Sequence, residues 1–309
     1  MARVLVFAPA PTLTITVEEH EGAPDVHLHV GGQGVWQARM LAALGADVTV
    51  VCTVAGETGA VARQLLDREG FEVVAIDGDG NGPAYVHDRR SGDRQEVVEA
   101  HGEPLTRHDL DALYSATLRA AMDAELVILS GPDGDEMLEA DVYRRLASDM
   151  RELGRTVLVD LAGERLAAAL EGGVDVLKVS HEELVDDGRV DDGDDEGQLV
   201  AAAQQLADDG IALVAVTRAD AGSVVVGEEG AWRVVAPQLE PVDTRGAGDS
   251  YTAGLAAALA AGGSHADAVR LGAAAGAVNA TRRGLGTGDA DAIRAIAERV
   301  ELEPIGKER

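Results

Sequence analysis

Val242-Asp243-Thr244-Arg245-Gly246-Ala247-Gly248-Asp249-Ser250 is the stretch that decides the fold, and an alanine-rich segment, 251–259, follows it. Two glycines just before a helix let backbone N–H groups point towards one position, because no Cβ blocks the approach. A helix N-terminus adds unpaired donors and a partial positive charge, so Gly246, Ala247 and Gly248 predict an anion-binding turn. Asp249 would repel a phosphate there unless it orients and deprotonates a hydroxyl that attacks the phosphate.

The same residues also have a purely structural interpretation. Gly-x-Gly is common before helices, and an aspartate near the first helical turn is a good capping residue. The rest of the chain has to separate the two interpretations.

The composition limits the partners of this protein. The chain has 309 residues and a formal net charge of −29, with 55 acidic and 26 basic residues, of which only Lys178 and Lys307 are lysines. A field of this sign repels nucleic acid and anionic membranes, so neither is expected as a partner. A phosphate site must therefore be built locally from backbone donors, Arg, Lys or a divalent cation.

The location of the protein is also predicted from its sequence. No stretch is long and apolar enough to span a bilayer. The apolar run at 4–7 is too short for the apolar region of a signal peptide. The single cysteine, Cys52, excludes an intrachain disulfide. We expect a cytoplasmic protein.

Strand-like and helix-like segments alternate along most of the chain. Apolar runs at 126–129, 156–160, 174–179 and 212–217 are separated by helical patterns at 139–153, 164–170 and 198–208. Repeating β–α units predict an α/β fold, with a mostly parallel sheet between two layers of helices, formed by a single domain over residues 1–309. Ligands bind beyond the carboxyl ends of such strands, which is where the stretch 242–250 falls.

Two segments interrupt this alternation, at about 12–30 and 83–101. Their apolar and polar residues alternate, as in half-exposed strands. They are predicted to pair as one small β-sheet that forms a lid over the core. Arg89, Arg90 and Arg94 flank a turn in the second segment and are expected to be solvated.

Two motifs carry a resemblance to a known family. Gly31-Gly32-Gln33-Gly34-Val35-Trp36-Gln37-Ala38 resembles the N-terminal signature of the ribokinase-like sugar kinases, the PfkB family. The stretch 243–249 is similar to their C-terminal signature, Asp-Thr-x-Gly-Ala-Gly-Asp. The order of elements, including the lid, agrees over nearly the whole chain. Residues 284–288, Gly-Leu-Gly-Thr-Gly, resemble the branch that includes phosphofructokinases and tagatose-6-phosphate kinases.

The resemblance implies transfer of the γ-phosphoryl of ATP to a hydroxymethyl group of a sugar, sugar phosphate or nucleoside, with Mg²⁺ and in some members a monovalent cation. Asp249 would be the base, and Gly246, Ala247 and Gly248 the anion hole. It also implies a homodimer that pairs through the lid. The nucleotide-binding positions would be Lys178, Ser180, Thr217, Gly222 and Asn279, and Glu183 would influence Mg²⁺ indirectly.

One of these positions has a second interpretation. Ser180 replaces the Asn of the family motif Asn-x-x-Glu, whereas Glu183 is retained. Glu183 is equally explained as an exposed acid at a helix start.

The departures from the family pattern lie at the substrate side. Thr12 holds the place of a sugar-binding Asp, and Gln33 and Trp36 replace Lys and Asn of Gly-Gly-Lys-Gly-x-Asn. The stretch 81–85, which ends at Tyr85, lacks the Arg of the phosphofructokinase lid motif. Each lost polar contact with the substrate typically weakens the free energy of binding by ~1–3 kcal/mol. The predicted substrate-binding residues are Thr12, Gly31, Gly32, Gln33, Trp36 and Arg245.

These departures leave three functions open. The first is a kinase for a sugar or sugar phosphate, in which Arg245 anchors a phosphate. The second is a nucleoside kinase in which Trp36 stacks on the base. The third is a binding protein that has kept the fold and lost turnover.

Overall fold

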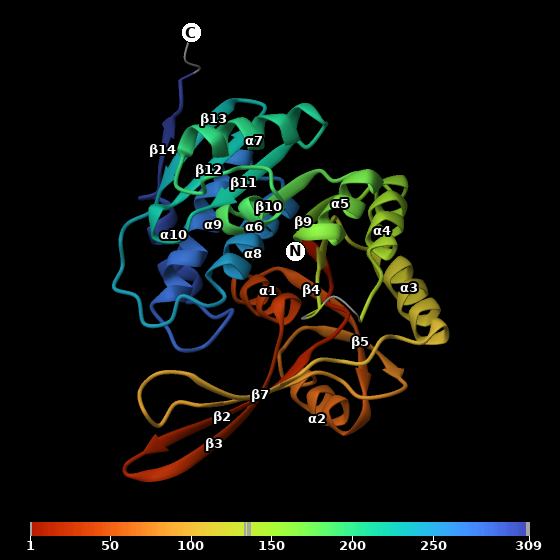
Figure 1. Ribbon diagram of the computed structural model, residues 1–309. Coiled ribbons are helices and arrows are strands. Elements are labelled where there is room, and N and C mark those ends of the chain that lie inside the picture. Colours follow the sequence, from red (N-terminus) through yellow and green to blue (C-terminus); the bar gives the residue numbers. More distant parts are fainter. Residues whose placement is uncertain (1, 133, 135–136, 307–309) are drawn as a thin grey trace.

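A ten-stranded sheet forms the centre of the computed structural model, which describes residues 2–132, 134 and 137–306 (Figure 1). The strands between β11 and β5 run parallel, and β12, β13 and β14 are antiparallel additions at one edge. In spatial order the strands are β14 (Glu301–Pro304), β13 (Gly230–Val235), β12 (Ser223–Gly227), β11 (Leu213–Thr217), β10 (Val176–Ser180), β9 (Thr156–Asp160), β8 (Leu126–Ser130), β1 (Arg3–Phe7), β4 (Asp47–Ala55) and β5 (Glu72–Gly78).

Helices cover both faces of this sheet. In β1, Val4 and Val6 belong to one buried cluster, and Leu5 and Phe7 to the other, because successive strand residues point to opposite faces. The first face packs against α1 (Gln33–Ala43), α2 (Gly56–Leu66), α8 (Ala247–Ala260), α9 (His265–Ala280) and α10 (Ala290–Ala297). The second packs against α3 (Arg107–Ala121), α4 (Ala140–Glu152), α5 (Gly163–Gly172), α6 (His181–Asp186) and α7 (Glu196–Asp208).

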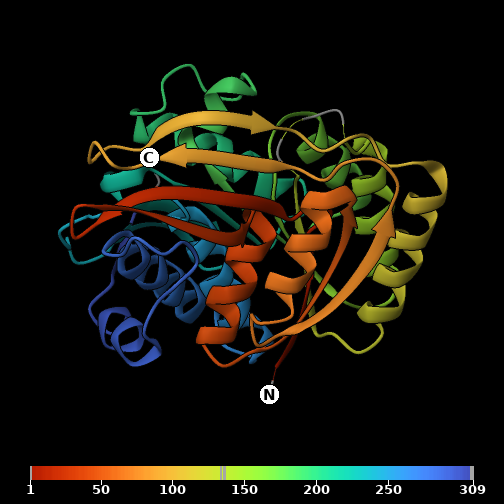
Figure 2. The ribbon, with the colours of Figure 1, turned by 90° about the horizontal axis from the view of Figure 1, so that it is seen from below.

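A separate four-stranded sheet lies beside this core (Figures 1 and 2). Its strand order is β3 (Ala23–Gly31), β2 (Thr12–His20), β6 (Ala84–Asp88) and β7 (Gln95–Ala100). The two segments predicted to pair therefore do so, through the parallel strands β2 and β6. The register places Thr14 beside Tyr85 and Thr16 beside His87, which gives this small sheet one polar face.

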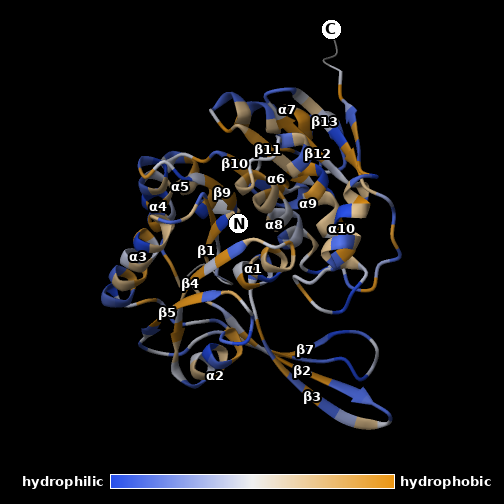
Figure 3. Cartoon of the chain, turned by 180° about the vertical axis from the view of Figure 1, so that it is seen from behind, coloured by the Kyte–Doolittle hydropathy of each residue, from blue (hydrophilic) through white to orange (hydrophobic). Residues whose placement is uncertain are grey.

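The opposite face of the small sheet is apolar, and hydrophobic and hydrophilic residues alternate along its strands (Figure 3). Val26 is 54% exposed, Leu28 48% and Val98 50%. They share this face because Val26 pairs with Val17, Leu28 with Ile15, and Val98 with Val86.

The predicted three-layer core and small sheet are confirmed. Strand β14 was missed, because Glu301 and Glu303 give its short run no strong apolar signal. In the described part of the chain, no helix has the length and apolar character needed to cross a membrane. The single-domain organisation and the cytoplasmic location stay predictions.

Candidate active site

The first turn of α8 presents its backbone to the carboxyl ends of the strands. Its N-cap is Gly246, whose φ of 69° lies in the left-handed region that favours glycine. No side chain caps this helix, whereas serines cap α6 and α9. Asp249 lies in this first turn. The predicted anion-binding turn therefore has a suitable backbone, with a carboxylate beside it.

A buried lysine lies directly behind this turn. A Cβ on Gly248 would approach Nζ of Lys178 to 2.9 Å, so a larger residue there would displace the ammonium group. Nζ of Lys178 donates to Oδ1 of Asp160 at 3.0 Å, and their side chains are only 8% and 1% exposed. Lys178 thus brings a fixed positive charge against the turn.

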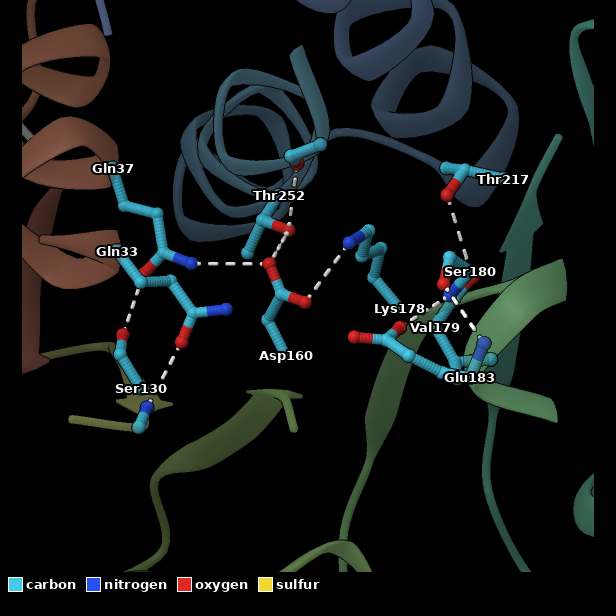
Figure 4. Close-up of polar contacts among 12 residues, drawn as sticks. Gln33, Gln37, Ser130, Asp160, Lys178, Val179, Ser180, Glu183, Thr217 and Thr252 are labelled. Atoms are coloured by element: carbon cyan, nitrogen blue, oxygen red, sulfur yellow. Dashed lines mark hydrogen bonds and ion pairs between the residues drawn. The ribbon is translucent and has the colours of Figure 1, made fainter. Parts of the chain in front are cut away.

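Asp160 is the centre of a hydrogen-bond network that joins α8 to α1, β8, β9 and β10 (Figure 4). Its Oδ2 accepts from Thr252 Oγ1 of α8 at 2.8 Å and from Gln37 Nε2 of α1 at 3.1 Å. Gln37 in turn accepts a hydrogen bond from Ser130 Oγ of β8 at 2.5 Å. The network holds the first turns of α8 in register with α1, β8 and β9.

Electrostatics keeps Lys178 protonated. Burial alone would lower its pKa, but the nearby carboxylates of Asp160, Glu183 and Asp249 raise the pKa of Lys178 well above its usual value. Burial raises the pKa of Asp160, while the ammonium group of Lys178 opposes that rise. The result is a charged residue at the base of the anion-binding turn.

A cavity of about 140 Å³ opens on one side of this turn. Gly222 is required in its wall, since its φ is 81° and a Cβ would lie 2.4 Å from the Val234 carbonyl oxygen. Ala219 also has a positive φ, of 48°, in the left-handed region that favours glycine. The lining includes the predicted nucleotide residues Thr217 and Gly222, together with Ala247, Gly248, Tyr251 and Gly276.

Three other predicted nucleotide or metal residues are engaged within the protein. Ser180 Oγ accepts from the Glu183 N–H at 3.1 Å, and Glu183 Oε2 accepts from the Ser180 N–H at 2.7 Å, which forms a capping box on α6 (Figure 4). Asn279 is fully buried, with its Nδ2 donating to the Arg245 carbonyl oxygen at 2.8 Å. Its Oδ1 accepts from the N–H of Gly286 at 2.9 Å. Asn279 therefore positions the loop before α8.

A second cavity, of about 260 Å³, opens between the small sheet and the loop before α8. Gly31 lies behind its wall, where a Cβ would approach Thr14 and Trp36 to 3.1–3.2 Å. Gln33 points elsewhere, with its Oε1 accepting from the Gly131 N–H at 2.9 Å. Four of the six predicted substrate residues line the cavity, namely Thr12, Gly32, Trp36 and Arg245.

Comparison with known proteins agrees with this geometry. The model of the pfkB family carbohydrate kinases matches residues 5–292. The chain belongs to this family. It is 29% identical over 280 residues to the 1-phosphofructokinase of Haloferax volcanii, covering 87% of this chain and 88% of that protein. It is also 29% identical over 290 residues to ATP-dependent 6-phosphofructokinase isozyme 2 of Mycobacterium tuberculosis, covering 89% and 83%.

A solved structure has the same fold. Phosphofructokinase-2 from Escherichia coli, in complex with potassium, has a TM-score of 0.86 and 26% identity, and the match covers 97% of this chain and 99% of that one. The prediction of a PfkB carbohydrate kinase, and hence of a phosphotransferase, is confirmed.

The expectation that the three arginines of the small sheet are solvated is wrong for two of them. Arg89 Nη2 donates to Asp243 Oδ2 at 2.6 Å, and these side chains are 16% and 14% exposed. The guanidinium of Arg94 lies 4.7 Å from the centre of the Tyr85 ring. Arg90, paired with Asp88, is half exposed, as expected. The turn folds back towards the loop before α8, which no local pattern reveals.

Asp160, Gln37 and Thr252 were not predicted as residues of the candidate active site. A signal was available for Asp160, because it ends an apolar strand at the edge where ligands bind. Gln37 and Thr252 fall on helix positions whose periodicity shows burial but not a polar partner.

Proposed function

We propose that this chain is an ATP-dependent kinase that transfers the γ-phosphoryl group to a hydroxyl of a sugar or sugar phosphate, with Asp249 as the base. One observation supports this above all. Three of the four residues before Asp249 border the two cavities: Arg245 lines the larger one, and Ala247 and Gly248 line the smaller. A nucleotide in the smaller cavity and an acceptor in the larger one would meet beside Asp249.

The chemistry follows from the groups around this junction. A carboxylate with a pKa near ~4 does not deprotonate a free alcohol. It orients the hydroxyl and takes the proton as the new O–P bond forms, which suits a loose transition state. The N–H groups of Gly246, Ala247 and Gly248 would stabilise the equatorial phosphate oxygens, and Lys178 adds charge from behind.

The residues present suit a metal that arrives with the nucleotide. Among the described residues, no group of three His, Cys, Asp or Glu could hold an ion. Mg²⁺ commonly keeps several waters and binds phosphates with one or two carboxylates, so a complete protein cage is not needed. Bound Mg²⁺ would offset phosphate charge. Dependence on a monovalent cation is tested by adding potassium to the assay, because E. coli phosphofructokinase-2 forms a complex with that ion.

The acceptor is proposed to be a sugar phosphate, as the names of the phosphofructokinase relatives suggest. A nucleoside kinase is the second candidate, because Trp36 and Tyr85 give the acceptor cavity two aromatic walls that suit a base. A homodimer through the exposed apolar face of the small sheet remains part of the proposal. For comparison, E. coli phosphofructokinase-2 has a tetrameric inhibited form.

The proposed function is tested by ADP release with Mg-ATP over free sugars, hexose phosphates and nucleosides. We expect the highest kcat/KM with a hexose phosphate. Preference for a nucleoside would favour the second candidate. Absence of turnover with every acceptor would leave a sugar- or nucleotide-binding protein.

A further inference from the structure

The smaller cavity, of about 140 Å³, differs from the acceptor cavity in its chemistry. Among the described residues, no charged side chain lines it, whereas two arginines and two glutamates line the acceptor cavity. Its volume lies below the range of about 300–1,000 Å³ that is typical of sites for whole small molecules. The cavity therefore suits one uncharged part of a nucleotide, which is the base, better than it suits the phosphates.

Small apolar side chains form the walls of this cavity, where β13 and α9 lie side by side (Figure 1). Strand β13 contributes Val234, and α9 contributes Ala273 and Ala277, which are one helical turn apart and share a face. A Cβ on Gly276 would lie 2.9 Å from the Ala247 carbonyl oxygen, so this glycine lets α9 approach the first turn of α8. These walls offer apolar contact to any base and distinguish none.

Ser223 and Tyr251 also line the cavity, and their hydroxyl groups form a buried pair. Ser223 Oγ and Tyr251 Oη lie 3.0 Å apart in a hydrogen bond, and the residues are 2% and 5% exposed. Each hydroxyl carries one proton, and their mutual bond uses only one of the two. The pair therefore retains one O–H donor, and it also has lone pairs that can accept from a ligand.

The surroundings of Tyr251 fix its ring and keep its hydroxyl neutral. A Cβ on Gly272 would approach two ring atoms of Tyr251 to 3.2 and 3.3 Å, so this glycine makes room for the ring. Burial raises the pKa of Tyr251 to about 12, so the hydroxyl keeps its proton at neutral pH. A group that is already ordered loses little conformational entropy when a ligand binds to it.

We propose that Ser223 and Tyr251 contact the edge of the nucleotide base and make the kinase tolerant of the purine, so that GTP serves as phosphoryl donor as well as ATP. A hydroxyl group both donates and accepts, and it rotates to suit its partner. The pair can donate to a ring nitrogen and accept from the 6-amino group of adenine. It can equally donate to the 6-oxygen and accept from the N1–H of guanine. Fixed donors and acceptors would favour one of these patterns.

The chemical step is the same with either donor. The bond from the γ-phosphorus to the bridging oxygen breaks as the bond from the acceptor oxygen to that phosphorus forms. GDP leaves with the electron pair of the broken bond, and Asp249 takes the proton of the acceptor hydroxyl. This role of the hydroxyl pair rests on the proposed kinase function and extends it to purine nucleoside triphosphates. Because the base lies away from the reacting bonds, the pair should affect nucleotide binding and leave kcat unchanged.

The test measures Kd for ADP and GDP on the full chain by calorimetry, with pyrophosphate as a probe that lacks the base. The variants are Tyr251→Phe and the double variant Ser223→Ala/Tyr251→Phe, which keep the aromatic ring and remove one or both hydroxyls. Tyr114→Phe is the matched control, because the Tyr114 hydroxyl donates to Asp149 Oδ2 at 2.6 Å and Tyr114 does not line the cavity. Tyr251→Phe alone provides the test if the double variant does not fold.

We expect the wild-type Kd values for ADP and GDP to agree within about tenfold, and the double variant to weaken both by about threefold or more. Tyr114→Phe should leave both unchanged, and no variant should change the Kd for pyrophosphate. With ATP and GTP as donors, the double variant should raise KM by the same factor and leave kcat within about twofold. A preference for ADP over GDP of more than about tenfold, or a smaller change in the double variant, overturns the proposal.

Binding and turnover together separate failure of the hydroxyl pair from failure of the kinase. Turnover with ATP, combined with Kd values that the double variant leaves unchanged, overturns the role of the pair and keeps the kinase. Binding of ADP and GDP that weakens in the double variant, without turnover on any acceptor, rejects the kinase and keeps a purine-binding site. Absence of binding of ADP and GDP to the wild type rejects both.

Discussion

The two sides of the proposed acceptor and nucleotide site are built in different ways. The anion-binding turn consists of consecutive residues, Gly246 to Asp249, and is supported by the buried pair Lys178 and Asp160. The acceptor side is assembled from β2, α1, β6 and the turn before β7, and much of it is reached by solvent. In the proposed kinase, the chemistry would therefore depend on buried packing behind the turn, whereas the choice of acceptor would depend on separate polar residues that can change independently.

The largest effect is expected when the buried pair is broken. Lys178→Met leaves the carboxylate of Asp160 without its opposite charge, which should lower the free energy of unfolding by about 3–5 kcal/mol. The exposed pair of Arg144 and Asp141 is the control, because its side chains are 42% and 54% exposed. Arg144→Met should cost less than about 1 kcal/mol in the same urea unfolding experiment. Equal losses would show that the turn is not supported by a buried charge.

Acid should lower the stability of the fold through the acceptor side. Burial, followed by the charges of Arg94 and Arg89, lowers the pKa of His87 to about 4 from 6.5. As the pH falls from 6.5 to 4, the unfolded chain binds a proton before the folded one, so stability decreases over this range, by at most about 3 kcal/mol for this residue. His87→Gln should flatten that part of the profile of unfolding free energy against pH. His20→Gln, at an exposed position of β2, is the control. An unchanged profile in His87→Gln would contradict the burial of a neutral imidazole.

A smaller effect is expected at the ion pair that connects the small sheet to the loop before α8. Arg89 of the small sheet pairs with Asp243, which lies three residues before Gly246 and also accepts from the Arg245 N–H at 3.1 Å. A double-mutant cycle with Arg89→Ala and Asp243→Ala should give a coupling of about 1 kcal/mol in the free energy of unfolding. A coupling of zero would mean that the small sheet is not held to the loop before α8 by this pair.

The sequence predicted the structural features that depend on residues close together in the chain. The residues Gly246 to Asp249 predict the turn, because the glycines and the start of the helix are adjacent in the chain. Alternation in 12–30 and 83–101 predicts the small sheet, since strand periodicity is local. The contacts of Lys178 with Asp160 and of Arg89 with Asp243 join residues 18 and 154 positions apart, and no periodicity encodes them. For the same reason Arg94 was predicted to be solvated, although the fold brings it beside Tyr85 and Arg245.

The central claim, that Asp249 takes the proton of the acceptor hydroxyl, is tested most directly by the kcat of Asp249→Asn with the preferred acceptor. The substitution keeps the shape of the side chain and removes the base. We expect kcat to fall about 10²- to 10⁴-fold, with the Kd for ATP changed by no more than a few fold. A kcat close to that of the wild type would contradict the assignment of Asp249 as the base.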